Sequence, residues 1–511
     1  MIKYQVSRRR CYWFLWFLFA FLLTGYVTAT ASLGRDVLRI GIPTFPCSLN
    51  PVYATTESSQ AIINKVFDSL FAYNARGQIV EGLAKHVRLA IGPKTSTLTL
   101  DLNENARFSD GHALEPDDVI QTVKLLKNPA FKYPYFSSIR YLTGIEKKGP
   151  HGLKITIQSQ PGFWKNYLRF KILNGREIKG ISAETFKTVR LSGTGPYRFK
   201  TVAEPAQVVL ELNPFADQGT SSGRSMYRFI EYTVIADTRL TPLKLLNNEI
   251  DICELQPENI GVYERTPLWK QRFHIRKYKK LGYTFLVFNL RRAAMDQNVR
   301  NLFYNIVQGG DFLDHFLKNK GERVRSPFLQ LKEGVITHPL KTTPLSQEVH
   351  LKILTNTESK LRRELVLFLK QEMKPYKIML EPIFLEYHTF LQTLKTGDCD
   401  LAISGYIVDL DFDMREIFGS GSYFNYARFQ NREMDTLLET LTMIVDPVKR
   451  NRIYGEAHQL WLKHLPFIPL FNLDYYIGVS TKVDIPIETC RIVGAEGDFL
   501  FNIKDWKVSR Q

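Results

Sequence analysis

Three aspartates on alternate positions, Asp409, Asp411 and Asp413, are the first candidates for chemistry in this chain. Alternating carboxylates are typical of a calcium loop, which also requires glycine at its sixth position and glutamate at its twelfth. Met414 and Ser420 occupy those positions when the loop is counted from Asp409, so the sequence argues against an EF-hand. Two interpretations of the carboxylates stay open: a pair of catalytic acids, or a single charge that binds a ligand.

Other motifs for covalent or metal chemistry are absent from the sequence. It has no H-E-x-x-H pair and no G-K-[ST] phosphate loop, and its ten histidines are dispersed. The G-x-S-x-G pattern at residues 219–223 lies in a polar stretch, without the strand directly before it that a nucleophile elbow requires. Four cysteines follow residue 31 without any C-x-x-C pair: Cys47, Cys253, Cys399 and Cys490. Either one or two disulfides or free buried thiols fit these positions. We therefore predict no catalytic residue, no metal and no cofactor, and expect binding rather than turnover.

The N-terminus has the pattern of an export signal. A basic stretch is followed by an apolar run over residues 12–23 and by Ala29-Thr30-Ala31, which has the A-x-A form of a signal-peptidase site. We predict a signal peptide over residues 1–31 that is cleaved after Ala31. The alternative is an uncleaved membrane anchor, because residues 11–29 are almost long enough to span a bilayer.

The formal net charge of +17 raises the question of an acidic partner. The basic residues are scattered along the chain, and no nucleic-acid-binding module is recognisable. We predict a solvated basic surface, no nucleic-acid partner, and membrane contact only through a transporter or this surface.

The strands and helices that position these residues are predicted in two different patterns along the chain. Near the start, a short strand from residue 37 leads through a proline-containing loop to an amphipathic helix over about 58–70. After residue 268, strands at 283–290, 349–356, 377–384 and 399–406 alternate with helices. This order predicts an α/β protein of two lobes with mixed sheets flanked by helices and a ligand cleft between the lobes.

Eight segments in order along the chain carry a family resemblance. They include "SLNPVYATT" (48–56), "FSDGHALEPDDV" (108–119), "GTGPY" (193–197), "LKLLNNEIDI" (243–252), "YTFLVFNLRRAAMDQNVRNLFYNIV" (283–307) and "DLAISGYIVDLDFD" (400–413), followed by residues 424–439 and 446–471. In these segments the chain resembles the extracellular solute-binding proteins of family 5, the peptide and nickel class that serves ABC importers.

The resemblance implies a two-lobed periplasmic binding protein-like fold of the class with an extra subdomain. Lobe I would comprise residues 32–269 and 473–511, with an inserted subdomain at about 76–189, and lobe II would comprise 270–472. It also implies a periplasmic monomer that captures oligopeptides and delivers them to an inner-membrane ABC importer permease.

The resemblance also implies the site. The aspartate that pairs with a peptide's α-amino group in the family falls at Asp409, while Asp411 and Asp413 are expected as loop and cap residues. Tyr406 replaces the family's tryptophan. Two further pairs are expected as ligand contacts: Ile407 with Val408, beside Asp409, and Thr55 with Thr56, in the loop after the first strand. For Thr55 and Thr56, a simple turn before a helix is the alternative.

One departure from the family concerns the ligand's carboxylate. Dipeptide binders commonly place an arginine in the stretch that matches residues 353–360, and none is present there. This favours a longer oligopeptide. A family ligand of another kind (a nickel chelate, haem or a sugar), a sensor derived from the same fold, and an exported hydrolase remain alternatives; nickel is disfavoured because no histidine lies near Asp409.

Overall fold

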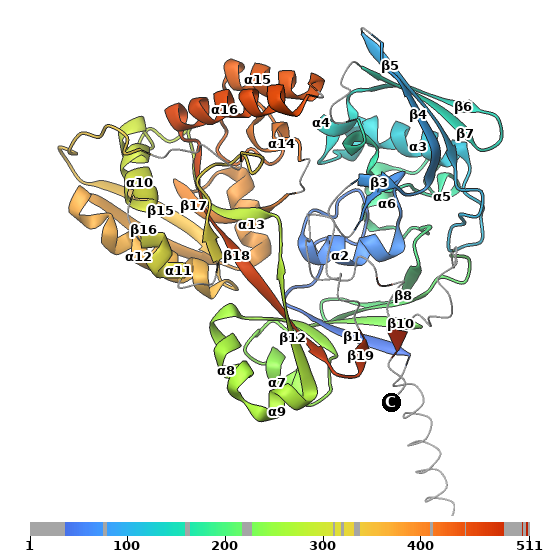
Figure 1. Ribbon diagram of the computed structural model, residues 1–511, viewed down its shortest axis with the longest axis horizontal. Coiled ribbons are helices and arrows are strands. Elements are labelled where there is room, and N and C mark those ends of the chain that lie inside the picture. Colours follow the sequence, from blue (N-terminus) through green and yellow to red (C-terminus); the bar gives the residue numbers. More distant parts are fainter. Residues whose placement is uncertain are drawn as a thin grey trace, which may run out of the picture.

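The computed structural model describes residues 36–74, 79–92, 94–158, 164–216, 227–309, 312–317, 321–331, 338–408, 412–444, 446–484, 503 and 507–508. Asp409, Asp411, Cys490 and the expected signal peptide lie outside these residues. The chain forms two large bodies joined by long strands (Figure 1). The α/β class predicted from the sequence, with mixed sheets flanked by helices, is confirmed.

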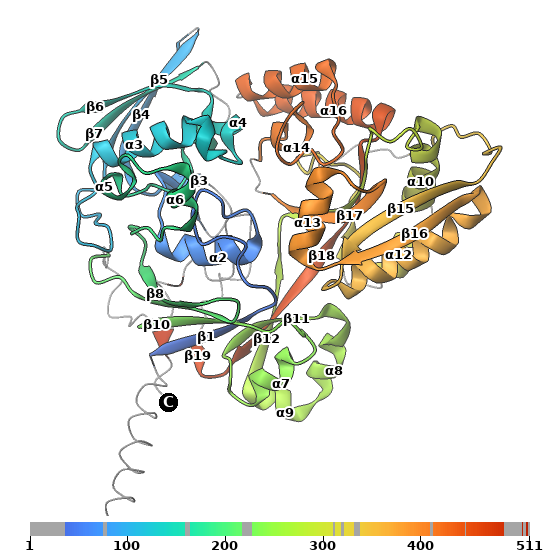
Figure 2. The same cartoon turned by 180° about the vertical axis from the view of Figure 1, so that it is seen from behind.

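A twelve-stranded sheet runs through both bodies, with the order β16-β15-β17-β13-β18-β11-β1-β10-β9-β8 and with β12 and β14 also paired to β18. The connection is β18 (Phe467–Ser480), whose first half pairs with β13 and whose second half pairs with β11 and β12. Because one strand belongs to both halves of the sheet, the bodies share a continuous backbone ladder (Figure 2).

The first body is built on β1 (Val37–Ile42), which pairs in parallel with β10 (Phe229–Val234) and β11 (Ile252–Leu255). Antiparallel strands extend the sheet: β9 (Gln207–Leu212) and β8 (Tyr197–Ala203). The expected amphipathic helix is α2 (Glu57–Val66), shorter than the predicted 58–70. It ends early because Phe67 takes an extended backbone at φ −124°, although its side chain stays fully buried.

A four-stranded antiparallel sheet decorates this body, in the order β4-β5-β7-β6. Its strands are β4 (Ala84–Ala90), β5 (Thr95–Leu102), β6 (Leu142–Lys148) and β7 (Gly152–Gln158). The alternation in β5 buries Leu98, Leu100 and Leu102 in the apolar core of this body. Smaller elements complete the region: β2 (Phe71–Tyr73), β3 (Ile79–Glu81), α3 (Pro116–Lys127), α4 (Phe136–Ile139), α5 (Gly175–Ile178) and α6 (Ala183–Thr188).

The second body surrounds β13 (Gly282–Phe288), whose seven residues are all buried. β15 (Val349–Asn356) pairs in parallel with β16 (Ile378–Leu385) and β17 (Leu401–Ile407), as the alternating strands and helices led us to expect. The helices are α10 (Gln297–Gly309), α11 (Phe312–Leu317), α12 (Lys360–Glu372), α13 (Tyr387–Thr396), α14 (Arg415–Phe418), α15 (Arg432–Met443) and α16 (Pro447–His464).

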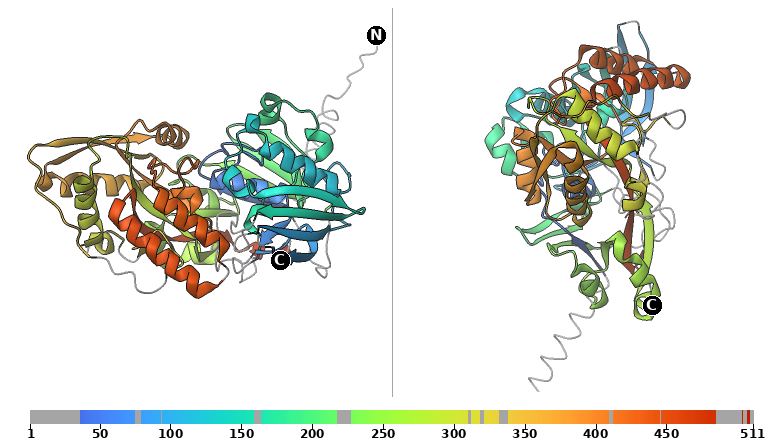
Figure 3. Two further views of the ribbon diagram at one scale, coloured as in Figure 1. Left: turned by 90° about the horizontal axis from the view of Figure 1, so that it is seen from above. Right: turned by 90° about the vertical axis from the view of Figure 1, so that its left-hand side faces the viewer.

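A smaller group of helices packs beneath the joining strands. It comprises α7 (Thr241–Leu246), α8 (Ile260–Arg265) and α9 (Pro267–Arg272), beside β12 (Phe273–Lys279). The remaining strands are β14 (Gly321–Arg323), β19 (Val483–Asp484) and β20 (Lys507–Val508). Seen from above, the two large bodies lie side by side (Figure 3). Among the described residues, no helix combines the length and apolar character needed to cross a bilayer.

Candidate functional site

A cavity of about 450 Å³ lies between the two large bodies. Its size falls within the range of about 300–1,000 Å³ that is usual for ligand pockets. Aromatic side chains from both bodies dominate its wall: Tyr133, Tyr135, Tyr167 and Phe170 from the first, and Tyr387, Tyr406, Phe412, Phe424 and Tyr426 from the second. The strands that join the bodies contribute Tyr283, Phe471 and Tyr475. Apolar faces with polar tips suit a ligand that carries both apolar and polar groups.

Thr55 and Thr56 lie in the wall of this cavity on the first body. Thr56 is the N-cap of α2: its hydroxyl accepts the Ser59 backbone N–H at 3.4 Å, and its side chain is buried. Its hydroxyl is thus engaged in the helix cap, as the turn interpretation expected. Thr55 is only half-buried and faces the cavity without a capping role.

Tyr406, Ile407 and Val408 lie in the opposite wall, where β17 ends. The Tyr406 ring stacks on Phe285 with centroids 4.2 Å apart, and its hydroxyl donates to the Phe424 carbonyl at 2.6 Å. Tyr406 is therefore held rigidly. Asp409 lies outside the described residues, directly after Val408.

Arg362 is a cavity residue that the sequence analysis missed. It lies in the first turn of α12, two positions beyond the stretch 353–360 that lacks an arginine. Among the described residues no carboxylate pairs with its guanidinium, which donates from Nη1 to Asn356 Oδ1 at 3.2 Å. Burial lowers the pKa of Arg362, which means that its charged form lacks the compensation an anion would give. The available signal was Ser359, a residue type that commonly caps a helix and that places Arg362 in the first helical turn after β15.

Lys280 supplies a second buried cation at the cavity wall, between the strands that join the bodies. Its ammonium pairs with Glu57 of α2 and lies 2.6 Å from Glu254 of β11. It also lies 4.3 Å from the centre of the Tyr475 ring. Although burial opposes the charged form, the two carboxylates raise the pKa of Lys280 above its usual value. Lys280 is therefore a satisfied structural cation.

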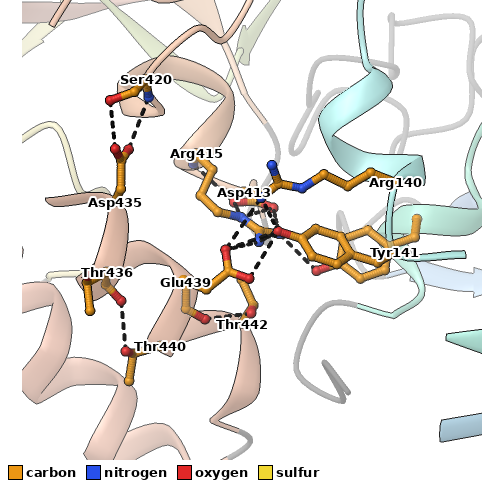
Figure 4. Close-up of polar contacts among 11 residues, drawn as sticks. Arg140, Tyr141, Asp413, Arg415, Ser420, Asp435, Thr436, Glu439, Thr440 and Thr442 are labelled. Carbon is orange, nitrogen blue, oxygen red and sulfur yellow. Dashed lines mark hydrogen bonds and ion pairs between the residues drawn. The ribbon is translucent and has the colours of Figure 1, made fainter. Parts of the chain in front are cut away.

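A polar network bridges the two bodies beside the cavity (Figure 4). Arg415 of α14 donates to the hydroxyls of Tyr141 and Tyr167 on the first body, to Tyr167 at 3.0 Å. On its own body it binds Asp413 and lies 3.0 Å from Glu439. Although burial opposes the charge, Asp413 raises the pKa of Arg415 above its usual value.

Asp413, which we expected to be a loop or cap residue, is the buried counterion of this network. Its Oδ1 also accepts the Arg415 backbone N–H at 3.0 Å. It is therefore committed to Arg415 rather than available to a ligand.

Neither a metal centre nor a disulfide is found in the part of the chain that the structure describes. There, no group of three or more histidine, cysteine, aspartate or glutamate side chains is arranged to hold a metal ion. Cys47, Cys253 and Cys399 carry free thiols, and Cys47 is exposed.

A family model and named relatives both match this chain, and both are solute-binding or peptide-binding proteins. The model of the bacterial extracellular solute-binding proteins, family 5 (middle region), matches residues 78–330. The oligopeptide-binding protein AppA of Bacillus subtilis is 20% identical over 493 residues, covering 88% of each chain. The periplasmic murein peptide-binding protein MppA of Escherichia coli is 20% identical over 474 residues, covering 84% of this chain and 86% of MppA.

Solved structures share the fold. AppA in complex with a nonapeptide superposes with a TM-score of 0.82 at 18% identity, covering 93% of this chain and 99% of AppA. NikZ of Campylobacter jejuni in complex with Ni(L-His) superposes with a TM-score of 0.81 at 19% identity, covering 93% of this chain and 99% of NikZ. Because these two proteins hold different ligands on one fold, the fold alone does not fix the ligand.

Proposed function

The chain belongs to the bacterial extracellular solute-binding proteins of family 5, and we propose that it captures oligopeptides between its two bodies for an ABC importer. It is a binding protein and not an enzyme. The relatives AppA and MppA are named for oligopeptide and murein peptide binding, and MppA is named as periplasmic. We extend this location to the present chain, with residues 1–31 as a cleaved export signal.

The position of Arg362 at the cavity is the main support for a peptide ligand. Its guanidinium faces an aromatic-lined cavity and has no carboxylate partner in the described part of the chain, which suits it to the carboxylate of a ligand. The arginine that is absent from residues 353–360 is thus replaced by one from the next helical turn. The sequence argument against a short peptide therefore loses its basis, and the cavity volume suits a peptide of a few residues.

Asp409 is proposed to bind the other end of the peptide. It follows Val408, which lines the cavity wall. An ammonium that loses its water in a closed cleft needs a compensating charge, which a carboxylate supplies. We further propose that residues 32–269 with 473–511 and residues 270–472 move as two lobes, that ligand binding favours the closed arrangement, and that the protein acts as a monomer.

Mass spectrometry of the protein purified from its own cells tests this proposal. Gentle isolation followed by denaturation should release a ladder of short peptides. A sugar, haem or metal chelate released in place of peptides would contradict the proposal and identify the alternative ligand class.

A further inference from the structure

We infer that Asn356 and Gly405 are positioning residues that hold Arg362 as a cation with no carboxylate partner among the described residues, so that the cavity selects peptides with a free carboxylate. This inference rests on the proposed function and deepens it. It concerns the residues that hold the arginine in place and leave its charge available.

Asn356 is the last residue of β15, and its side chain is buried. Its Oδ1 accepts from Arg362 Nη1 at 3.2 Å, while its Nδ2 donates to Glu358 Oε2 at 2.9 Å. The amide is thereby fixed in one orientation, because its oxygen must face the guanidinium and its nitrogen must face the carboxylate.

Glu358 is itself fixed, since its Oε1 accepts the Tyr387 backbone N–H at 3.1 Å, where α13 begins. A chain of contacts therefore runs from the start of α13 through Glu358 and Asn356 to Arg362. The amide between Glu358 and Arg362 is neutral, so it orients the guanidinium without pairing with its charge.

Gly405 provides the surface beside which the guanidinium lies. A Cβ atom added at this position of β17 would lie 2.6 Å from Arg362 Nη2. Since ordinary contacts are longer than this, any side chain at position 405 would displace the guanidinium. The displaced group is the end of a flexible side chain, so we expect such a substitution to move Arg362 without disrupting the strand.

Two substitutions follow from these contacts. Asn356→Asp places a carboxylate where Arg362 now has a neutral partner, and this carboxylate would neutralise the cation. Gly405→Ala leaves the charge uncompensated but shifts its position. The matched controls are Asn431→Asp, at the N-cap of α15, and Gly455→Ala, in α16 with open space around its Cβ position. Neither control residue lines the cavity.

For the experiment, the exported protein is first stripped of bound ligand by unfolding and refolding. It is then mixed with a random pool of tripeptides that are free acids and with the same pool prepared as C-terminal amides. Mass spectrometry of the bound fraction gives the ratio of acid to amide. We expect the wild type and both controls to favour the acids on the order of 10- to 100-fold, the range of a hydrogen-bonded charge. In Asn356→Asp the ratio should fall toward unity while binding of the amides persists, and Gly405→Ala should give an intermediate ratio.

An unchanged acid preference in both variants would overturn the inference. If Asn356→Asp fails to give a cooperative thermal melt, the ratio of bound acid to bound amide in Gly405→Ala decides whether the inference holds. A wild type that binds both pools equally would overturn the inference while leaving the proposed function intact. A wild type that binds neither pool would contradict the proposed function and the inference with it.

Discussion

Arg415 Nη2 in the second body donates to the hydroxyl of Tyr167 in the first body, at a distance of 3.0 Å. The two residues lie 248 positions apart in the sequence, one in each body, and Tyr167 lines the cavity. Arg415 is only 6% exposed, and its counterion Asp413 is 10% exposed. This buried ion pair therefore links the two bodies by hydrogen bonds beside the cavity.

Replacing Arg415 by methionine removes this bridge and leaves the Asp413 carboxylate buried without its cation. We expect a loss of about 3–5 kcal/mol in the free energy of unfolding, the cost of breaking a buried ion pair by removing one partner. Denaturant titration measures this loss. The control Arg452→Met removes an exposed ion pair with Glu456 and should change the stability by less than about 1 kcal/mol. Equal effects of the two substitutions would contradict the assigned role of Arg415.

Lys280 gives the stability a dependence on pH. Its native pKa is raised by Glu254 and Glu57 against the opposing effect of burial, so its contribution is fully present below the unfolded value of about 10.4. That contribution is lost as the pH rises through the raised native pKa. Denaturant titrations between neutral and alkaline pH should therefore show falling stability above about pH 10.

Lys280→Met should make this alkaline decline smaller without abolishing it, because burial also raises the pKa of tyrosines such as Tyr283. Lys244→Met, which removes a pair with Glu249 at the surface, should leave the decline unchanged. An alkaline decline of the same size in Lys280→Met would show that other groups cause it.

The three described cysteines should differ in reactivity. Cys47 is accessible to solvent, although neighbouring residues partly surround its sulfur. This partial desolvation opposes the thiolate, and hydrogen bonds with Ser59 and Thr56 outweigh it and lower the pKa of Cys47. Burial raises the pKa of Cys253, and raises that of Cys399 to about 11. Iodoacetamide at neutral pH should modify Cys47 in the folded protein, and Cys253 and Cys399 only after unfolding. Peptide mapping checks each site, and early modification of Cys253 would contradict its position in the core.

Asp409 is expected to contribute most of the selectivity for a free amino group. Asp409→Asn should weaken the binding of short peptides by about 2–5 kcal/mol, because a desolvated ammonium would lose its counter-charge. Calorimetric titration with peptides, compared with the same peptides acetylated at the amino terminus, measures the effect. The control Asp398→Asn changes an exposed carboxylate outside the cavity wall. Unchanged affinity in Asp409→Asn would remove Asp409 from the site.

The sequence predicted the fold well because its signals are local or sequential. The buried run of β13 and the alternation in β5 are properties of single strands, and the family motifs occur in order along the chain. The same motifs led to Thr55, Thr56 and Tyr406, all of which line the cavity.

The parts that sequence could not predict depend on tertiary contacts. Arg362 lies just beyond the stretch in which an arginine was sought, and only the tertiary fold, which sets its guanidinium beside Gly405 of β17, brings it to the cavity. The pairing of Arg415 with Tyr141 joins residues 274 positions apart. Asp413 shares the alternating pattern of its neighbours, and nothing in that pattern indicates that Arg415 is its partner.

A crystal structure of the protein purified with its natural ligand tests the central claim most directly. We predict electron density for an extended short peptide between Thr55 and Tyr406, with its carboxylate on Arg362 and its amino group on Asp409. Density for a metal chelate or a sugar in this cavity, or a peptide bound with Arg362 and Asp409 both out of contact, would contradict the account.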